Sequence, residues 1–172
     1  MAEIGTDISK ASRILKKNEL VAIPTETVYG LAGNALDPIA IAKIYTTKDR
    51  PSFDPLITHV KNITDASTLV HPFPKLAHKI AEQFWPGPLT LLLPKRRHVP
   101  DMLTSGLEKM AIRVPDHPIT LELLKQLNFP LAAPSANPFG YISPTTSRHV
   151  DNQLGEKIPY IVEGGPAQIG LE

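Results

Sequence analysis

Residues 20–33 read LVAIPTETVYGLAG. The first four residues are apolar, and this predicts a short buried β-strand. The stretch PTETVYG then carries two threonines, a glutamate and a tyrosine, where a plain turn would need far fewer polar groups. Because loops at strand ends converge in sheets flanked by helices, this stretch marks a candidate site.

On both sides of this strand in the sequence, predicted helices and strands alternate irregularly. Asp7 caps a predicted helix over residues 8–18, and Asp37 with Pro38 begins another over 38–48. Further helices are predicted over 63–70, 74–85, 117–127 and 143–154, and further strands over 56–60, 89–95, 110–114, 130–134 and 160–164. Some connections are too short for a helical crossover, so we predict an α/β (α+β) fold with a mixed sheet flanked by helices. The wholly apolar run 89–95 suits a central strand.

The composition limits the class of protein. With 172 residues and 42% hydrophobic content, the chain fills one domain, and its 18 prolines cluster where apolar runs end. The formal charge of +1 gives no general argument for binding nucleic acid or a membrane. Cysteine is absent, which excludes disulfides, thiolate metal sites and cysteine nucleophiles. No apolar stretch approaches the roughly 20 residues that cross a bilayer, so we expect a soluble, cytoplasmic protein.

Polar residues follow two more of the predicted elements. Lys48 and Arg50 lie at the end of the helix 38–48, and Ser135 and Asn137 lie on a proline-bounded turn after the strand 130–134. Taken singly, the basic pair suits the negative end of a helix, and the other pair suits a local turn. If the groups converge, they form the inventory for binding a polyanion such as a nucleoside triphosphate. The phosphate loop GxxxxGK[ST] and the motif GxGxxG are absent.

Two polar residues, His59 and Arg113, lie inside otherwise apolar predicted strands. A histidine in a strand is more often a satisfied core residue than a catalyst. A buried guanidinium is costly unless it meets a carboxylate or an anionic ligand, and Asp116 is the nearest structural candidate. The other histidines show no metal-ligand spacing, so no metal site is predicted in the protein itself.

Several long segments occur in an order and spacing typical of one family. They are PTETVYGLAGNA, KDRP followed by PLITHV, FWPGPLTLLLP, AIRVPDHP, APSANPFGYISPTT and EGGPAQIGLE. From about residue 20 to 172, the chain therefore resembles the threonylcarbamoyl-AMP synthases, whose catalytic domain is YrdC-like.

The resemblance implies a fold and a reaction. The expected fold is a twisted mixed sheet with helices around a large concave, positively charged cavity, of the YrdC/RibB-like type. The expected enzyme is a nucleotidyltransferase that condenses L-threonine, bicarbonate or CO2, and ATP to threonylcarbamoyl-AMP and pyrophosphate. Magnesium would bind mainly through the ATP phosphates. A tRNA-modifying transferase complex would use the intermediate to make threonylcarbamoyladenosine in transfer RNA.

The resemblance also assigns residues. The basic pair and the Ser-x-Asn pattern of the family map onto Lys48, Arg50, Ser135 and Asn137, which would hold the phosphates, with Lys48 and Arg50 as the catalytic cations. The threonine pocket of the family is similar to the region of Thr25, Thr27, Tyr29, His59 and Arg113.

The resemblance also implies a role for the stretch PTETVYG. The hydroxyls of Thr25, Thr27 and Tyr29 would face the amino acid, and the glycines would let the backbone turn away. Glu26 would orient a neighbouring arginine or lysine, which we favour over assistance in proton removal from the amine. Asp54 stands where the family commonly has asparagine, so its carboxylate would either weaken the hold of Arg50 on phosphate or face away.

The resemblance also bears on the domain content of the chain, and the sequence leaves two other functions open. We expect residues 1–172 to form a single YrdC-like catalytic domain, without the linker and second domain of longer family members, as in a truncated form. One alternative is a non-catalytic module that binds double-stranded RNA or transfer RNA on the same basic surface. The other is a carbamoyltransferase-type domain like that of hydrogenase-maturation proteins, although the cysteines that accompany it are missing here.

Overall fold

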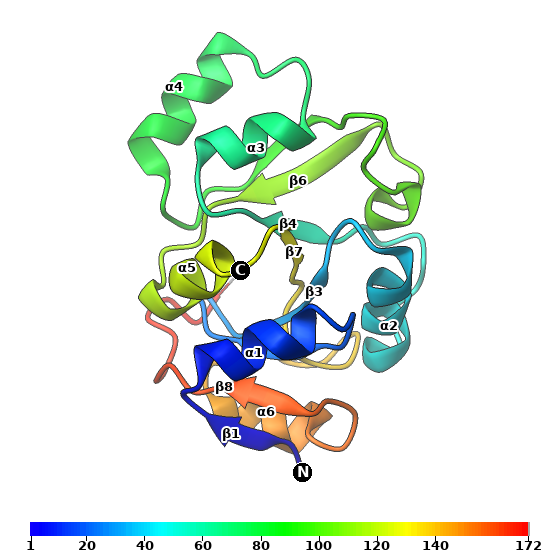
Figure 1. The fold of residues 1–172 in the computed structure, drawn as a ribbon, viewed down its shortest axis with the longest axis vertical. Coiled ribbons are helices and arrows are strands. Elements are labelled where there is room, and N and C mark those ends of the chain that lie inside the picture. Colours follow the sequence, from blue (N-terminus) through cyan, green and yellow to red (C-terminus); the bar gives the residue numbers. More distant parts are fainter. Residues whose placement is uncertain (172) are drawn as a thin grey trace.

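The computed structural model describes residues 1–171, and its core is one continuous sheet. The eight strands are β1 (Glu3–Gly5), β2 (Val21–Ile23), β3 (Gly30–Asn34), β4 (Ile57–His59), β5 (Leu91–Pro94), β6 (Lys109–Arg113), β7 (Leu131–Ala132) and β8 (Tyr160–Val162). Their spatial order is β1-β8-β2-β3-β7-β4-β6-β5. Figure 1 shows this succession from β1 at one end of the molecule to β6 near the other.

The sheet is mixed, as the irregular alternation predicted. β8 runs parallel to both β1 and β2, and β4 runs parallel to β6. The pairs β2/β3, β3/β7, β4/β7 and β5/β6 are antiparallel. The predicted fold class is therefore confirmed.

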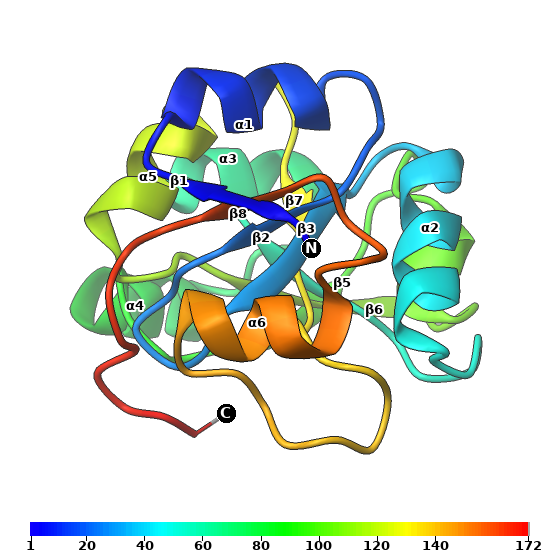
Figure 2. The same cartoon turned by 90° about the horizontal axis from the view of Figure 1, so that it is seen from below.

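Helices cover both faces of the sheet. They are α1 (Ile8–Leu15), α2 (Pro38–Lys48), α3 (Ile63–Leu69), α4 (Lys75–Phe84), α5 (Pro118–Lys125) and α6 (Ser147–Leu154), with a 3-10 turn, η1, at Asp101–Thr104. Asp7 caps α1 and Asp37 caps α2 with their side chains, as the sequence predicted. In Figure 2, α1 and α6 lie on opposite faces of the strands that they cover.

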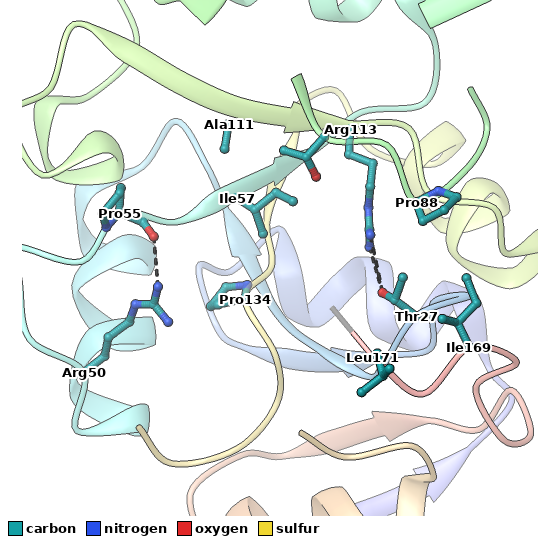
Figure 3. A pocket seen from close by; sticks show the side chains of 11 residues that line it. Thr27, Arg50, Pro55, Ile57, Pro88, Ala111, Arg113, Pro134, Ile169 and Leu171 are labelled. Atoms are coloured by element: carbon teal, nitrogen blue, oxygen red, sulfur yellow. Dashed lines mark hydrogen bonds between the residues drawn. The ribbon is translucent and has the colours of Figure 1, made fainter. Parts of the chain in front are cut away.

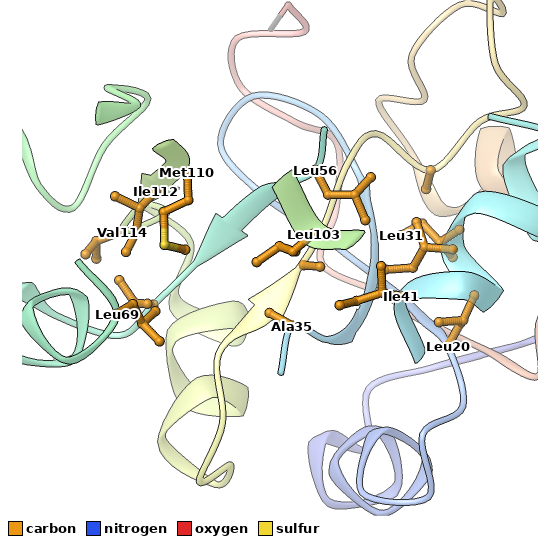
Figure 4. Packing of buried hydrophobic residues seen from close by; sticks show 14 of the residues in the cluster. Leu20, Leu31, Ala35, Ile41, Leu56, Leu69, Leu103, Met110, Ile112 and Val114 are labelled. Atoms are coloured by element: carbon orange, nitrogen blue, oxygen red, sulfur yellow. The ribbon is translucent and has the colours of Figure 1, made fainter. Parts of the chain in front are cut away.

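Two apolar clusters fill the space between sheet and helices. The larger cluster extends from Leu20 and Leu31 to Ile112 and Val114, and Figure 4 shows part of it. The smaller cluster packs α1 and α5 against the other face of β2 and β8. Burial of these side chains holds the strand ends in place, and those ends carry the polar residues of the candidate site.

The strand β3 was not predicted, and its glycines have a different use from the one expected. Gly30 and Gly33 lie inside this strand instead of turning the backbone away. A Cβ atom on Gly33 would lie 2.9 Å from Leu20 Cδ2, and one on Gly30 would lie 3.3 Å from Ala133 Cβ. The glycines therefore permit close packing across the sheet.

The predicted place of the run 89–95 was also wrong. The strand within it, β5, lies at the edge of the sheet and pairs only with β6. Leu92 is 62% exposed. The apolar composition of this run thus reflects packing on one face, with Leu92 turned to solvent.

Candidate functional site

A cavity of about 540 Å³ opens beside the ends of β4 and β6. Its walls are formed by Thr27, Arg50, Pro55, Ile57, Pro88, Thr90, Ala111, Arg113, Pro134, Ile169 and Leu171. Figure 3 shows Arg50 on one side of this cavity and Arg113 on another, with apolar side chains between them. The lining therefore combines a mostly apolar wall with two guanidinium groups, which is the usual character of a small-molecule site.

Arg113 ends β6 and is held by side chains from two other segments. The β4–β6 register places it beside His59, and its Nη2 donates to His59 Nε2 at 3.0 Å. Both Nη atoms also lie within 3.4 Å of Thr27 Oγ1, as the dashed line in Figure 3 indicates. Arg113 is only 5% exposed, so these contacts fix its guanidinium against the cavity.

Among the described residues, the carboxylate that pairs with Arg113 is that of Glu26, not that of Asp116 as the sequence suggested. Glu26 Oε1 lies 3.8 Å from Arg113 Nη1. Its Oε2 accepts a hydrogen bond from the backbone N–H of Asp116 at 3.1 Å. Glu26 is buried, so it offsets the charge of the arginine and anchors the following segment. This is the structural role favoured for Glu26.

His59 is neutral and its ring is already oriented. A guanidinium can only donate, so Nε2 is the acceptor and the ring proton lies on Nδ1. Burial lowers the pKa of His59 well below its ordinary value, and the charge of Arg113 lowers it further. The Nε2 lone pair is occupied by Arg113, so His59 supports the arginine and does not serve as a free base.

Two of the hydroxyls expected to face an amino acid are used inside the protein. Thr25 Oγ1 donates to the carbonyl of Val28 at 2.6 Å. Tyr29 donates to the carbonyl of Gly165 at 2.8 Å, and burial, with the charge of Glu163 adding to it, raises the pKa of Tyr29 to about 12. Neither Thr25 nor Tyr29 belongs to the described lining of the cavity, whereas Thr27 does.

Arg50 is positioned by the end of α2. Asp49 adopts the left-handed conformation with φ 52°, which terminates the helix and lets Arg50 N–H bond back to Tyr45 O at 3.0 Å. The guanidinium then donates to the carbonyls of Asp54 and Pro55 at 3.1 and 3.0 Å. Its Nη2 also lies 2.9 Å from Asp54 Oδ2. The Asp54 carboxylate therefore faces Arg50 and does not turn away.

Lys48, Ser135 and Asn137 are brought together, but behind the wall of the cavity. Lys48 is 1% exposed, and its ammonium donates to the backbone carbonyls of Ser135 and Asn137. Asn137 donates to the carbonyls of Pro138 and Tyr141. None of the three belongs to the described lining, so here Lys48 ties α2 to the turn that follows β7.

Sequence reasoning missed most of the apolar wall. Pro55, Ile57, Ala111 and Pro134 carry no chemical signature, and only their position in or beside strands would have pointed to them. Ile169 is joined to the opening stretch through its N–H bond to Glu26 O at 2.9 Å. The closing segment thus completes the cavity from the far end of the chain.

Within residues 1–171 no three histidine, aspartate or glutamate side chains gather closely enough to hold a metal ion. The described lining of the cavity also lacks a carboxylate. The donor set of the described residues therefore does not fit a resident Mg²⁺ ion. Among the described residues, none of the helices has the length and hydropathy required to cross a membrane.

Comparisons with known proteins identify relatives of this chain. A protein-family model named Sua5–YciO–YrdC and described as telomere recombination matches residues 13–172. The threonylcarbamoyl-AMP synthase of Bacillus subtilis (strain 168) is 48% identical over 169 residues, which cover 96% of this chain and 48% of that protein. The threonylcarbamoyl-AMP synthase of Pyrococcus abyssi is 45% identical over 94% of this chain and 48% of that protein.

A solved structure extends the likeness to three dimensions. The structure of P. abyssi Sua5 complexed with L-threonine matches with a TM-score of 0.96 and 42% identity, covering 98% of this chain and 52% of that one. The present chain thus spans about half the length of the curated relatives named here.

Proposed function

The chain belongs to the Sua5–YciO–YrdC family, and from this premise we propose that it catalyses the synthesis of threonylcarbamoyl-AMP. The reaction condenses L-threonine, bicarbonate or CO2, and ATP, and releases pyrophosphate. The product serves the threonylcarbamoyladenosine modification of transfer RNA through a downstream tRNA-modifying transferase complex.

One observation carries the proposal: two guanidinium groups, those of Arg50 and Arg113, line the same largely apolar cavity. The substrates supply two separate anionic groups, the carboxylate of the amino acid and the triphosphate of ATP. Guanidinium groups match the geometry of both anions through paired N–H donors. A cavity with one arginine for each anion suits a reaction that joins the two substrates.

We assign Arg113 to the threonine carboxylate and Arg50 to the phosphates. Arg113 is held by Thr27 and His59, so it meets a ligand already oriented. Lys48 shapes the phosphate side by fixing the carbonyls of Ser135 and Asn137. These assignments keep Arg50 as the catalytic cation that was predicted. They change the predicted roles of Lys48, Ser135 and Asn137 from direct contact with the phosphates to support behind the cavity wall.

The chemistry explains the apolar wall. The threonine amine and CO2 form a carbamate, whose oxygen attacks the α-phosphate in line while pyrophosphate leaves. Negative charge on the phosphate oxygens is then stabilised by Arg50, and Mg²⁺ enters with the triphosphate. Pro55, Ile57 and Pro134 limit the access of water to the labile carbamate.

The test is pyrophosphate release by the purified chain. We expect release from ATP to require both L-threonine and bicarbonate, and Arg50→Ala to slow it about 100- to 1,000-fold, as for the loss of one charge-stabilising donor. Arg148→Ala, which removes an arginine outside the cavity lining, should leave the rate unchanged. Release that ignores threonine would argue against the synthase assignment. A strongly salt-dependent binding of tRNA without nucleotide turnover would argue for the RNA-binding alternative.

A further inference from the structure

The opening stretch contains two hydroxyls whose hydrogen-bond directions can be worked out. Thr25 has one hydroxyl proton, and the short 2.6 Å contact assigns it to the carbonyl of Val28, which can only accept. Thr25 Oγ1 therefore acts as an acceptor towards its other neighbours. Its two lone pairs face three such neighbours, the backbone N–H groups of Thr27 and Val28, each at 3.2 Å, and Thr27 Oγ1 at 3.0 Å, so the two longer N–H contacts share one lone pair.

The direction of the next hydrogen bond follows. Because the proton of Thr25 is already used, a hydrogen bond between the two hydroxyls can only carry the proton of Thr27. Thr27 Oγ1 then presents only lone pairs towards Arg113, whose Nη1 and Nη2 lie 3.4 and 3.3 Å away and can only donate. The chain of donors thus runs in one direction, from Arg113 through Thr27 and Thr25 to the backbone.

We propose that Thr25 is a positioning residue for ligand binding: it fixes the hydroxyl of Thr27 as an acceptor and thereby orients the guanidinium of Arg113 towards an anionic group in the cavity. The proposal rests on the proposed function for the identity of that group, the carboxylate of the amino acid. It also implies that Thr27 cannot donate a hydrogen bond to a ligand, because its hydroxyl proton is already used.

The direction of the hydrogen bond between Arg113 and Thr27 matters because of the other groups around Arg113. His59 Nε2 accepts from Nη2, and the Glu26 carboxylate lies 3.8 Å from Nη1. If Thr27 reversed and donated towards the arginine, a proton would face an N–H donor inside a buried site, which is unfavourable. Thr25 prevents this reversal without touching the cavity.

Isosteric variants of the chain test the proposal by calorimetry with L-threonine and, separately, with ATP. In Thr25→Val we expect the Kd for L-threonine to rise about 2- to 12-fold, the scale of losing one hydrogen bond between neutral groups. The Kd for ATP should stay within about twofold, because Arg50 is on the other side of the cavity. Thr25→Ser keeps the hydroxyl and should restore binding of L-threonine.

Thr58, in the strand β4 beside β6, offers a matched control. Thr58 is fully buried, and its hydroxyl has no hydrogen-bond partner among the described residues. Thr58→Val therefore removes a buried hydroxyl of the same kind without affecting the chain of donors, and should bind L-threonine like the parent protein.

A second measurement needs no ligand. In ¹⁵N-arginine-labelled protein, rotation of the Arg113 guanidinium should be slow in the parent and in Thr25→Ser, and faster in Thr25→Val and Thr27→Val. Arg113→Lys identifies the signal by its loss. Thr27→Val leaves Thr25 in place, so it carries the test if Thr25→Val does not fold.

The outcomes separate the two proposals. Unchanged guanidinium rotation in both valine variants, equal weakening of ATP and threonine binding, or failure of Thr25→Ser to restore threonine binding would overturn the positioning role. If the parent protein binds no L-threonine but the rotation changes as expected, the positioning of Arg113 stands and the proposed function fails.

Discussion

The carboxylate of Asp54 lies 2.9 Å from the guanidinium of Arg50, and Arg50, unlike Asp54, lines the cavity proposed to bind ATP. Arg50 also donates to two backbone carbonyls, so its orientation does not depend on this ion pair alone. Asp54 therefore pairs with one donor of the guanidinium, and its negative charge would repel a phosphate that approaches Arg50.

We expect Asp54→Asn to bind ATP about two- to fivefold more tightly. The side chain of Asp54 is 36% exposed, so the effect should stay within the range of exposed ion pairs and should shrink at high salt. Calorimetric titration with ATP at low and high salt measures it. Asp49→Asn removes a nearby carboxylate that pairs with Lys157 instead, and should change little. Weaker binding by Asp54→Asn would mean that the carboxylate assists ATP.

Lys48→Met should destabilise the protein even without ligand. The substitution leaves the carbonyls of Ser135 and Asn137 without their buried cation, at a cost of about 2–3 kcal/mol. For a chain of this length, that lowers the Tm by several degrees in thermal unfolding. Lys17→Met, on the exposed surface, is the control. If Lys48→Met lost ATP binding with an unchanged Tm, direct contact between Lys48 and phosphate would be favoured.

Stability should fall as the pH drops below about 6.5. Folding lowers the pKa values of His59 and His117, mainly through burial, so the unfolded chain binds more protons than the native one at acidic pH. The stabilisation is thus complete above the ordinary histidine pKa and is lost below it, by at most about 1.4 kcal/mol per pH unit for each residue. Urea unfolding between pH 7 and 5 measures the slope. His59→Gln should reduce it, and an unchanged slope would contradict the assignment.

Tyr29→Phe should loosen the segment after β8. The hydroxyl of Tyr29 donates to Gly165 O and accepts from Gly164 N–H at 3.1 Å, so its loss should cost about 1–2 kcal/mol. Hydrogen exchange at residues 163–171 should become faster. Tyr141→Phe, at an exposed tyrosine, provides the comparison and should leave exchange unaltered.

The sequence predicted elements whose signals are local. Asp7 and Asp37 identified two helix starts because a capping side chain acts within one turn. The start of α6 was predicted too early, at residue 143, because the carbonyl of Pro144 is taken by the N–H of Tyr29 and the helix begins only after Thr146. Such pairing between distant segments leaves no periodicity to read, which also explains why β3 was missed.

The candidate site shows the same difference between local signals, which can be predicted from the sequence, and contacts between distant segments, which cannot. The residue types of Arg50 and Arg113 led to the prediction of anion-binding groups. Both side chains line the cavity, and the binding of anions by them stays a prediction. The hydroxyl directions of Thr25 and Tyr29 were not predictable, since Tyr29 donates to a carbonyl 136 positions further along the chain. Whether a polar side chain meets a ligand or another part of the protein depends on tertiary contacts of this kind.

The sheet joins segments from opposite ends of the chain. Glu3 pairs with Tyr160, Val21 also pairs with Tyr160, and Gly33 pairs with Ala132. Each pairing brings together strands that are far apart in the sequence. The chain entropy lost in closing such a long loop raises the free-energy barrier to folding. We therefore expect this chain to refold slowly for its size, with kinetics governed by encounters between remote strands and little affected by substitutions that strengthen single helices.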